Sequence, residues 1–176
     1  MRNVCTILFV TMVIVCLPGQ ATAQGRVGLG VGVGSGIGSG IVGLSGLSIY
    51  MPINAASIRI EPEFGYVHTS TTIDDIDFES SETLLLLGSG VFGYLSRGET
   101  IGYAGGRVGI QHSSDDDDDS TTGFVIGPAV GGEHFLGDAF SLGAEVRLTF
   151  MTMSEDGVEE DALFTNGSFI ARWYFK

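Results

Sequence analysis

The stretch Ile58-Arg59-Ile60-Glu61-Pro62-Glu63-Phe64-Gly65-Tyr66 decides the fold, because charged and apolar side chains alternate along it. Alternation with a period of two is typical of a β-strand, whose successive side chains point to opposite faces. Here one face carries three charges and the other carries isoleucines and aromatic rings. A barrel embedded in lipid needs strands of this kind, apolar outside and polar inside.

The same partition recurs further along the chain. In 139–152 an apolar series from Leu142 to Phe150 opposes Glu145 and Arg147, and in 163–175 aromatic residues oppose Arg172. The pattern predicts an inward-facing, structural set of charges: Arg59, Glu61, Glu63, Arg107, Glu133, Glu145, Arg147 and Arg172. Four arginines balance four glutamates, as a filled lumen requires, since an unpaired buried ion costs several kcal/mol. Across the last hairpin we expect Glu145 to lie close to Arg172.

Glycine marks the inner face of the first strand. Valine and leucine occupy the odd positions from Val27 to Val33, and glycine occupies the even positions from Gly28 to Gly34. On the inner wall of a small barrel, glycine relieves crowding where side chains converge. The glycines are therefore interpreted as strand residues and not as a phosphate-binding loop.

The periodicity predicts an all-β fold, an eight-stranded antiparallel up-and-down transmembrane β-barrel. Its strands are expected at 26–36, 41–53, 57–70, 82–96, 100–113, 121–136, 139–152 and 163–175. Short connections at 54–56, 96–99 and 137–138 alternate with longer ones at 37–40, 71–81, 114–120 and 153–162. This is the arrangement of outer-membrane barrels, and an even strand number places both termini on the short-turn side. The leucine run 84–87 is apolar in both phases, so the orientation of its strand stays open.

Residues 1–23 are interpreted as a cleaved signal peptide. Arg2 precedes an apolar stretch, and Ala21-Thr22-Ala23 forms a small-residue cleavage site. One domain, an outer-membrane β-barrel, is then expected over 24–176. Both cysteines, Cys5 and Cys16, lie in the leader, so the mature chain has no thiol chemistry. The run 84–87 is its longest uninterrupted aliphatic stretch and is far too short for a membrane helix, so a membrane role must use strands.

The charge balance is strongly acidic. The full chain has a net charge of −13. Removal of Arg2 leaves seven basic residues against 21 acidic ones, a net charge of −14 that argues against a nucleic-acid partner. Beyond the lumen set, most of the acids form three groups in or next to the predicted long loops: Asp74, Asp75, Asp77, Glu79 and Glu82; Asp115 to Asp119; and Glu155, Asp156, Glu159, Glu160 and Asp161. We expect these loops to be acidic and extracellular.

Aromatic residues cluster near the strand ends on the short-turn side. They are Tyr94, Tyr103, Phe135, Phe140, Trp173 and Phe175. Aromatic rings are enriched where a membrane meets water, so we predict an interfacial girdle at this end of the barrel.

Three stretches resemble one protein family. They are the segment 58–66, Gly127-Pro128-Ala129-Val130-Gly131-Gly132-Glu133, and Ala171-Arg172-Trp173-Tyr174-Phe175. In them the chain resembles the small, porin-like outer-membrane β-barrel domains of the OmpA-like and opacity-protein group. The resemblance implies an outer-membrane location with periplasmic termini. It also implies outer-membrane lipid and lipopolysaccharide as surroundings, the barrel-assembly machinery as a partner during biogenesis, and a monomeric state.

Two features of the sequence suggest metal binding or catalysis. The aspartates 115–119 could attract calcium, but they lack the spacing and the glycine of an EF-hand loop, so we predict no specific metal site. A diffuse role, in which the loop bridges divalent cations to lipopolysaccharide phosphates, stays open. His68-Thr69-Ser70 and His112-Ser113-Ser114 could pair a base with a hydroxyl nucleophile. No third catalytic member accompanies either triplet.

The sequence therefore predicts an outer-membrane barrel with a structural or surface-interaction role, no enzymatic activity and no cofactor. Three alternatives stay open. The first is a lipid-modifying enzyme of the lipid A deacylase type acting through His68 or His112. The second is a narrow pore, and the third is a soluble lipocalin-type barrel with its apolar face inward. The extracellular partner is not specified by any motif.

Overall fold

A computed structural model describes residues 26–38, 46–73, 78–115, 120–155 and 158–175, and all structural statements concern these residues. The predicted signal peptide, residues 1–23, lies outside them. The described strands are β1 (Arg26–Gly38), β2 (Gly46–Tyr50), β3 (Ile53–Ala55), β4 (Ile58–Ile73), β5 (Phe78–Ser96), β6 (Thr100–Asp115), β7 (Ser120–Phe135), β8 (Phe140–Glu155) and β9 (Val158–Phe175).

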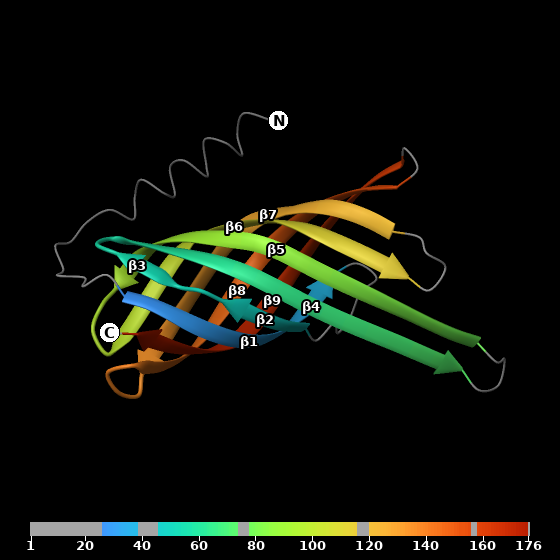
Figure 1. The fold of residues 1–176 in the computed structure, drawn as a ribbon. Helices are drawn as coiled ribbons and strands as arrows, with labels where there is room; N and C mark the ends of the chain where they lie inside the picture. Colours follow the sequence, from blue (N-terminus) through green and yellow to red (C-terminus); the bar gives the residue numbers. More distant parts are fainter. Residues whose placement is uncertain (1–25, 39–45, 74–77, 116–119, 156–157, 176) are drawn as a thin grey trace, which may run out of the picture.

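These strands form a closed antiparallel barrel (Figure 1). Each strand from β4 to β9 pairs with its neighbour in the sequence. The ring is closed by β1, which pairs with β9 from Val27↔Phe175 to Gly38↔Phe164. Between β1 and β4, the short strands β2 and β3 occupy the place of one strand. Within the described residues, the prediction of an eight-stranded up-and-down barrel is confirmed.

Proline interrupts the second strand of the barrel without shifting its register. Pro52 has no N–H group to donate to a ladder, which separates β2 from β3. The neighbouring backbone still pairs, because Gly28 N donates to Pro52 O at 2.9 Å and Met51 N donates to Pro62 O at 2.9 Å. The predicted strand 41–53 is therefore one strand of the barrel in two pieces, with 41–45 outside the described residues.

The hairpins are longer than predicted at one end of the barrel. Pairing of β4 with β5 continues to Ile73↔Phe78, and pairing of β8 with β9 continues to Glu155↔Val158. The predicted loops 71–81, 114–120 and 153–162 were therefore too wide. An antiparallel ladder satisfies its own backbone groups whether or not its side chains are apolar, so the loss of apolar alternation did not mark the strand ends.

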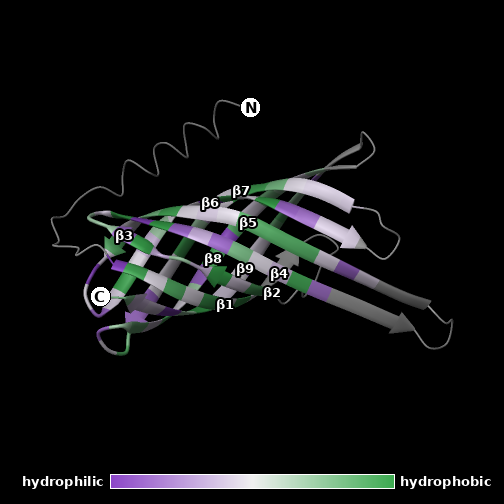
Figure 2. Ribbon diagram, in the orientation of Figure 1, coloured by the Kyte–Doolittle hydropathy of each residue, from purple (hydrophilic) through white to green (hydrophobic). Residues whose placement is uncertain are grey.

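The outer face carries large apolar side chains on every strand. Examples are Val31, Phe64, Leu87, Val130 and Phe169, of which Leu87 is 69 % and Phe169 is 79 % exposed. Figure 2 shows the resulting alternation of hydrophobic and hydrophilic residues along the strands. A lipocalin-type barrel has the opposite distribution, so this alternative was wrong.

The structure also settles the orientation of the leucine run in β5. Leu85 and Leu87 lie on the exposed outer face, while Leu84 and Leu86 are half-buried and line the interior. No helix in the described part of the chain is long and apolar enough to cross a membrane.

The glycines of β1 make room for lumen side chains, as predicted. A Cβ atom at Gly32 would lie 2.7 Å from the ring of Tyr50, and one at Gly30 would lie 3.0 Å from Cγ of Arg172. The bare inner face of β1 thus lets a tyrosine and an arginine lie against its backbone.

Candidate functional site: the charged lumen

All eight charged residues of the inward-facing set lie inside the barrel. Three come from β4, two from β8 and one each from β6, β7 and β9. Seven are buried, and Arg147 is partly buried. The alternation in each strand sends these side chains inward, because successive residues of a strand point to opposite faces. The structure thus gathers residues from five strands into one cluster, which we call the lumen network.

Arg107 is the centre of the lumen network. Its Nε donates to Glu145 Oε1 at 2.6 Å and its Nη2 donates to Glu145 Oε2 at 2.9 Å. The same guanidinium donates to Glu61 Oε1 at 2.5 Å and to Glu63 Oε2 at 3.1 Å. One cation therefore joins glutamates from β4 and β8 across the interior. Charge-assisted pairs of this kind are the strong hydrogen bonds of proteins.

Arg147 forms the part of the network nearest the long hairpins. Its Nη2 donates to Glu63 Oε1 at 2.9 Å and to the Tyr50 hydroxyl at 3.3 Å, and it lies 3.5 Å from Glu145 Oε1. Its side chain is 14 % exposed, whereas the other three arginines are at most 5 % exposed. Arg147 is therefore the most exposed arginine of the network.

Arg172 joins the centre to the short-turn end. Its Nε donates to Glu61 Oε2 at 3.0 Å, and its Nη1 donates to Glu133 Oε2 at 3.4 Å. Glu133 also pairs with Arg59 and accepts from the Ser141 hydroxyl at 2.9 Å. Every glutamate of the network thus has at least one arginine partner, and the four positive and four negative charges cancel.

The predicted pairing of Glu145 with Arg172 was wrong. Arg172 lies opposite Ser141 in the β8–β9 ladder, and Glu145 lies opposite Ser168. Strands of a barrel are tilted and staggered, so an inward side chain meets partners from across the lumen and not only from the adjacent strand. Glu145 accordingly pairs with Arg107 of β6, which is 38 positions away.

Aromatic rings surround the network on the inside. The guanidinium of Arg107 lies 4.9 Å from the ring centroid of Phe92 and 5.0 Å from that of Tyr50, and Arg59 lies 4.9 Å from that of Tyr103. Rings at these distances attract a desolvated cation through their negative faces. This role of the rings was not predicted from the sequence, although each ring shares its strand phase with a charged or glycine residue of the inner face.

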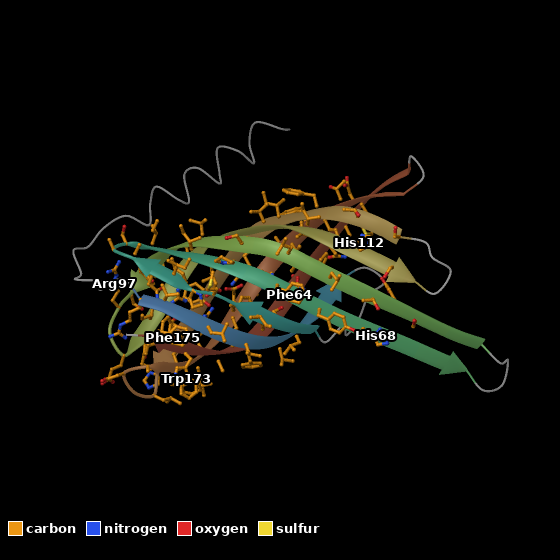
Figure 3. All side chains as sticks on the ribbon, viewed as in Figure 1. Phe64, His68, Arg97, His112, Trp173 and Phe175 are labelled. Atoms are coloured by element: carbon orange, nitrogen blue, oxygen red, sulfur yellow. The ribbon has the colours of Figure 1, made fainter. Side chains whose placement is uncertain are left out.

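The aromatic girdle was predicted only partly correctly. Trp173 and Phe175 lie on the exposed outer face near the short turns (Figure 3). Phe140 packs on Trp173, with the two ring centroids 5.1 Å apart. Tyr94 and Tyr103 instead point inward: Tyr103 is fully buried, and the Tyr94 hydroxyl donates to Asn54 at 2.5 Å. Position near a strand end sets the depth of a ring, whereas the alternation of the strand sets its face.

The three histidines lie on the outer face, each beside a threonine of the neighbouring strand. His68 Nδ1 lies 3.1 Å from Thr83 Oγ1, and His112 Nδ1 lies 3.1 Å from Thr122 Oγ1. His134 has the same arrangement with Thr100, at 2.9 Å. Figure 3 shows His68 and His112 toward the long hairpins. The side chain of Ser70 lies outside the described residues, so the first His-x-Ser triplet is described only in part.

The acidic groups are described at few positions. Glu82 accepts from the Ser113 hydroxyl at 2.7 Å, and Asp161 accepts from the Thr152 hydroxyl at 2.9 Å. Both acids belong to strands: Glu82 lies in β5, within the predicted strand 82–96, and Asp161 lies in β9, which begins earlier than predicted. The aspartates 116–119 and the side chain of Asp115 lie outside the described residues. Among described residues, no group of three or more potential metal ligands comes together.

No protein-family model and no curated protein matches this chain. Solved structures do match. The crystal structure of Neisserial surface protein A has a TM-score of 0.62 and 14 % identity, covering 85 % of this chain and 96 % of that one. A major outer membrane protein from Thermus thermophilus has a TM-score of 0.53 and 13 % identity, covering 85 % and 99 %. The chain thus has the fold of small outer-membrane β-barrels.

Proposed function

We propose that this chain is an integral outer-membrane β-barrel protein with a structural or surface-interaction role and a lumen closed by Arg/Glu pairs. The observation that carries the proposal is the inside-out distribution of side chains. Large apolar residues cover the outside, while the lumen network occupies the interior. A soluble protein rarely exposes a contiguous apolar surface of this extent, whereas lipid acyl chains cover it without cost.

The contacts of the network support a closed lumen. Arg107, Arg147 and Arg172 reach across the barrel to glutamates on other strands, and aromatic rings fill the space beside them. An eight-stranded barrel is just wide enough for side chains to fill. A permeating ion would have to break several charge-assisted hydrogen bonds at once, so we favour a plug over a narrow pore.

The surroundings of the barrel are part of the same proposal. We propose export by the signal peptide at 1–23, insertion by the barrel-assembly machinery, and periplasmic placement of the short-turn end. The long hairpins and their acidic residues would then face the exterior, next to lipopolysaccharide. We propose a monomer without a cofactor, whose acidic loops meet an extracellular partner or bridge divalent cations to phosphate groups.

A catalytic role for the histidines is less well supported. His68 and His112 lie on different strand pairs, and each imidazole is next to a threonine hydroxyl. His134, which lies near the short turns, makes the same contact outside any His-x-Ser triplet. Because the arrangement recurs without the triplet, we interpret it as a cross-strand pair of the outer face and propose no enzymatic activity.

Three measurements test the proposal. The protein should fractionate with the outer membrane, and heating a detergent-extracted sample should change its mobility on a gel, because the folded barrel resists the detergent. Recovery in the soluble fraction would contradict the membrane assignment. In planar bilayers the protein should show no large, steady open channel. A sustained conductance would show that the lumen is a pore and not a plug.

A further inference from the structure

Each hairpin formed by β4–β5, β6–β7 and β8–β9 carries one hydrogen-bonded polar pair on its outer face, toward the long-hairpin end (Figure 3). In the two His–Thr pairs Nδ1 and Oγ1 lie 3.1 Å apart, and in the third pair a threonine hydroxyl donates to an aspartate at 2.9 Å. We call these six residues the collar: His68 and Thr83, His112 and Thr122, Thr152 and Asp161.

The collar marks the edge of the apolar outer face. Two positions from each collar residue, toward the short turns, the same face of the strand carries a large, exposed apolar side chain. These side chains are Tyr66, Leu85, Ile110, Phe124, Phe150 and Leu163. A hydrogen bond within each pair lowers the cost of placing polar groups next to hydrocarbon, because it replaces part of their lost hydration. The pairs therefore suit the border between an apolar and a polar environment.

The register of the strands gives the tilt of the barrel. Following the ladder partner of each residue from Arg26 of β1 through β3 and on to β9 leads back to β1 at Gly36, ten residues further along the strand. Residues rise about 3.3 Å along a strand and strands lie about 4.8 Å apart, so this stagger tilts the strands by about 40° from the barrel axis. A row of ladder partners therefore climbs toward the long hairpins as it passes from β4 to β9.

The collar compensates for this climb and is level. His112 lies opposite Leu85, two positions below Thr83, and Thr152 lies two positions below the ladder partner of Thr122. The collar thus steps back toward the short turns by two residues for every two strands. A ring perpendicular to the barrel axis should step back by about 2.5 residues per two strands at this stagger. Residues on one face are spaced by two, so the collar follows such a ring as closely as a strand allows.

A second level lies nearer the short turns. It contains Thr100 and His134, whose Oγ1 and Nδ1 atoms are 2.9 Å apart, and the packed rings of Phe140 and Trp173. Each of these four residues lies twelve positions from a collar residue of its own strand. At a tilt of about 40°, twelve residues span about 30 Å along the barrel axis, the thickness of a typical hydrocarbon core. Between the two levels, no described outer-face residue of β4 to β9 is charged.

We propose that the two levels lie at the two faces of a lipid bilayer, with the collar hydrogen-bonded to the headgroups of the leaflet around the long hairpins. Headgroup phosphate and ester oxygens accept hydrogen bonds from imidazole and hydroxyl groups. The collar extends from β4 to β9, around most of the barrel, as a surrounding leaflet requires, whereas a protein partner would cover one side. The inference rests on the proposed membrane function and adds the residues that meet the headgroups.

The position of the collar also determines how far the barrel protrudes. Past the collar, β4 continues from His68 to Ile73, about 13 Å along the barrel axis at this tilt. The strands of the other two hairpins continue for at most three described residues beyond it. Among the described parts of the chain, the β4–β5 hairpin therefore stands furthest out of the bilayer and is the first that a large molecule outside would meet.

Nitroxide labels on single cysteines measure this geometry in nanodiscs of dioleoylphosphatidylcholine. Cys5→Ser and Cys16→Ser first remove the two cysteines of the chain. Labels at Thr83→Cys and Asp161→Cys should report the same headgroup depth, from collision rates with oxygen and with a nickel chelate. A label at Leu87→Cys should lie about 10 Å deeper, four residues below Thr83 along a tilted strand. Leu87 and Asp161 occupy one ladder row, so they are the matched pair that separates a level collar from a row.

Equal depths for the labels at Leu87 and Asp161 would overturn the inference, and so would collar labels that differ by more than about 5 Å, two residues along the axis. With Leu87 still shielded from the nickel chelate, either result would leave the membrane assignment intact. Access of the chelate to all labels would refute that assignment and the inference with it.

The second level has its own test. A label at Thr100→Cys should report headgroup depth, and a label at Val108→Cys, between the levels on the outer face of the same strand, should be shielded from the chelate. Burial of the Thr100 label in hydrocarbon would refute the spacing of the two levels. If Asp161→Cys does not insert, Thr152→Cys takes its place, because Thr152 lies opposite Asp161 in the same row.

Discussion

Replacement of Arg107 by methionine should destabilise the barrel by about 3–5 kcal/mol, the usual cost of removing one partner from a buried ion pair. Arg107 makes four hydrogen bonds to three glutamates, with distances from 2.5 to 3.1 Å. Without it, the interior holds three arginines and four glutamates. Methionine keeps most of the volume of arginine, so the loss reports charge pairing more than packing.

Among the three glutamates, Glu145 loses the most hydrogen bonds in this variant. Its two short hydrogen bonds come from Arg107, and its other described ion pair, to Arg147, is 3.5 Å long. A double variant, Arg107→Met with Glu145→Gln, leaves three arginines and three glutamates and restores neutrality. We expect it to lose only about 1–2 kcal/mol, the worth of the missing hydrogen bonds. The double variant should therefore be more stable than Arg107→Met alone.

The assay is urea unfolding from lipid vesicles, followed by the fluorescence of Trp173. This residue is the one tryptophan of the chain, and it is 58 % exposed on the outer face, so its emission should shift when it leaves lipid. Equal m-values among the variants would show that the same surface is exposed on unfolding. Arg26→Met is the control: Arg26 donates to the Asp138 carbonyl at 3.2 Å at an exposed site, and its loss should cost about 1 kcal/mol or less.

The reasoning would be refuted by a loss below about 1 kcal/mol for Arg107→Met. It would also be refuted if the double variant lost as much as the two single variants together. Additivity of this kind would mean that the two residues act independently, in spite of their contact.

Three further predictions use other parts of the barrel. Gly32→Val should lower the free energy of unfolding by about 1–3 kcal/mol, because its Cβ would lie 2.7 Å from the ring of Tyr50. Gly167→Ala is the control and should change stability little, because no atom lies within 4 Å of its Cβ. Similar losses for both variants in urea unfolding would contradict the packing of β1. Leu87→Arg, on the outer face in mid-strand, should lower the free energy of unfolding in vesicles by about 2–4 kcal/mol. Leu136→Arg, near a short turn, should lower it by about 1 kcal/mol or less. Equal losses would argue against a lipid belt around the barrel. His68→Ala and His112→Ala should each leave the lipid A profile unaltered by mass spectrometry, and loss of a lipid A modification in either variant would restore the enzymatic alternative.

The faces of the strands could be predicted because side-chain direction is a local property. In β4 the spacing of Arg59, Glu61 and Glu63 by two positions sends all three to one face, and the residues between them go to the other. The leucine run in β5 shows the limit of this logic, since it is apolar in both phases. There the face of Leu85 and Leu87 was set by pairing with β4 and β6, whose own patterns are clear.

The alternation in the sequence thus determined the barrel, the number of its strands and the charged residues that face inward, since the face of a side chain depends on period and phase alone. Only the tertiary structure decided which residues meet. Barrel tilt and stagger bring Arg172 within hydrogen-bond distance of Glu61, 111 positions away, and place Glu145 beside Arg107. The physical reason is that contacts across the lumen depend on how far each strand slides past its neighbour, a quantity that no single strand contains.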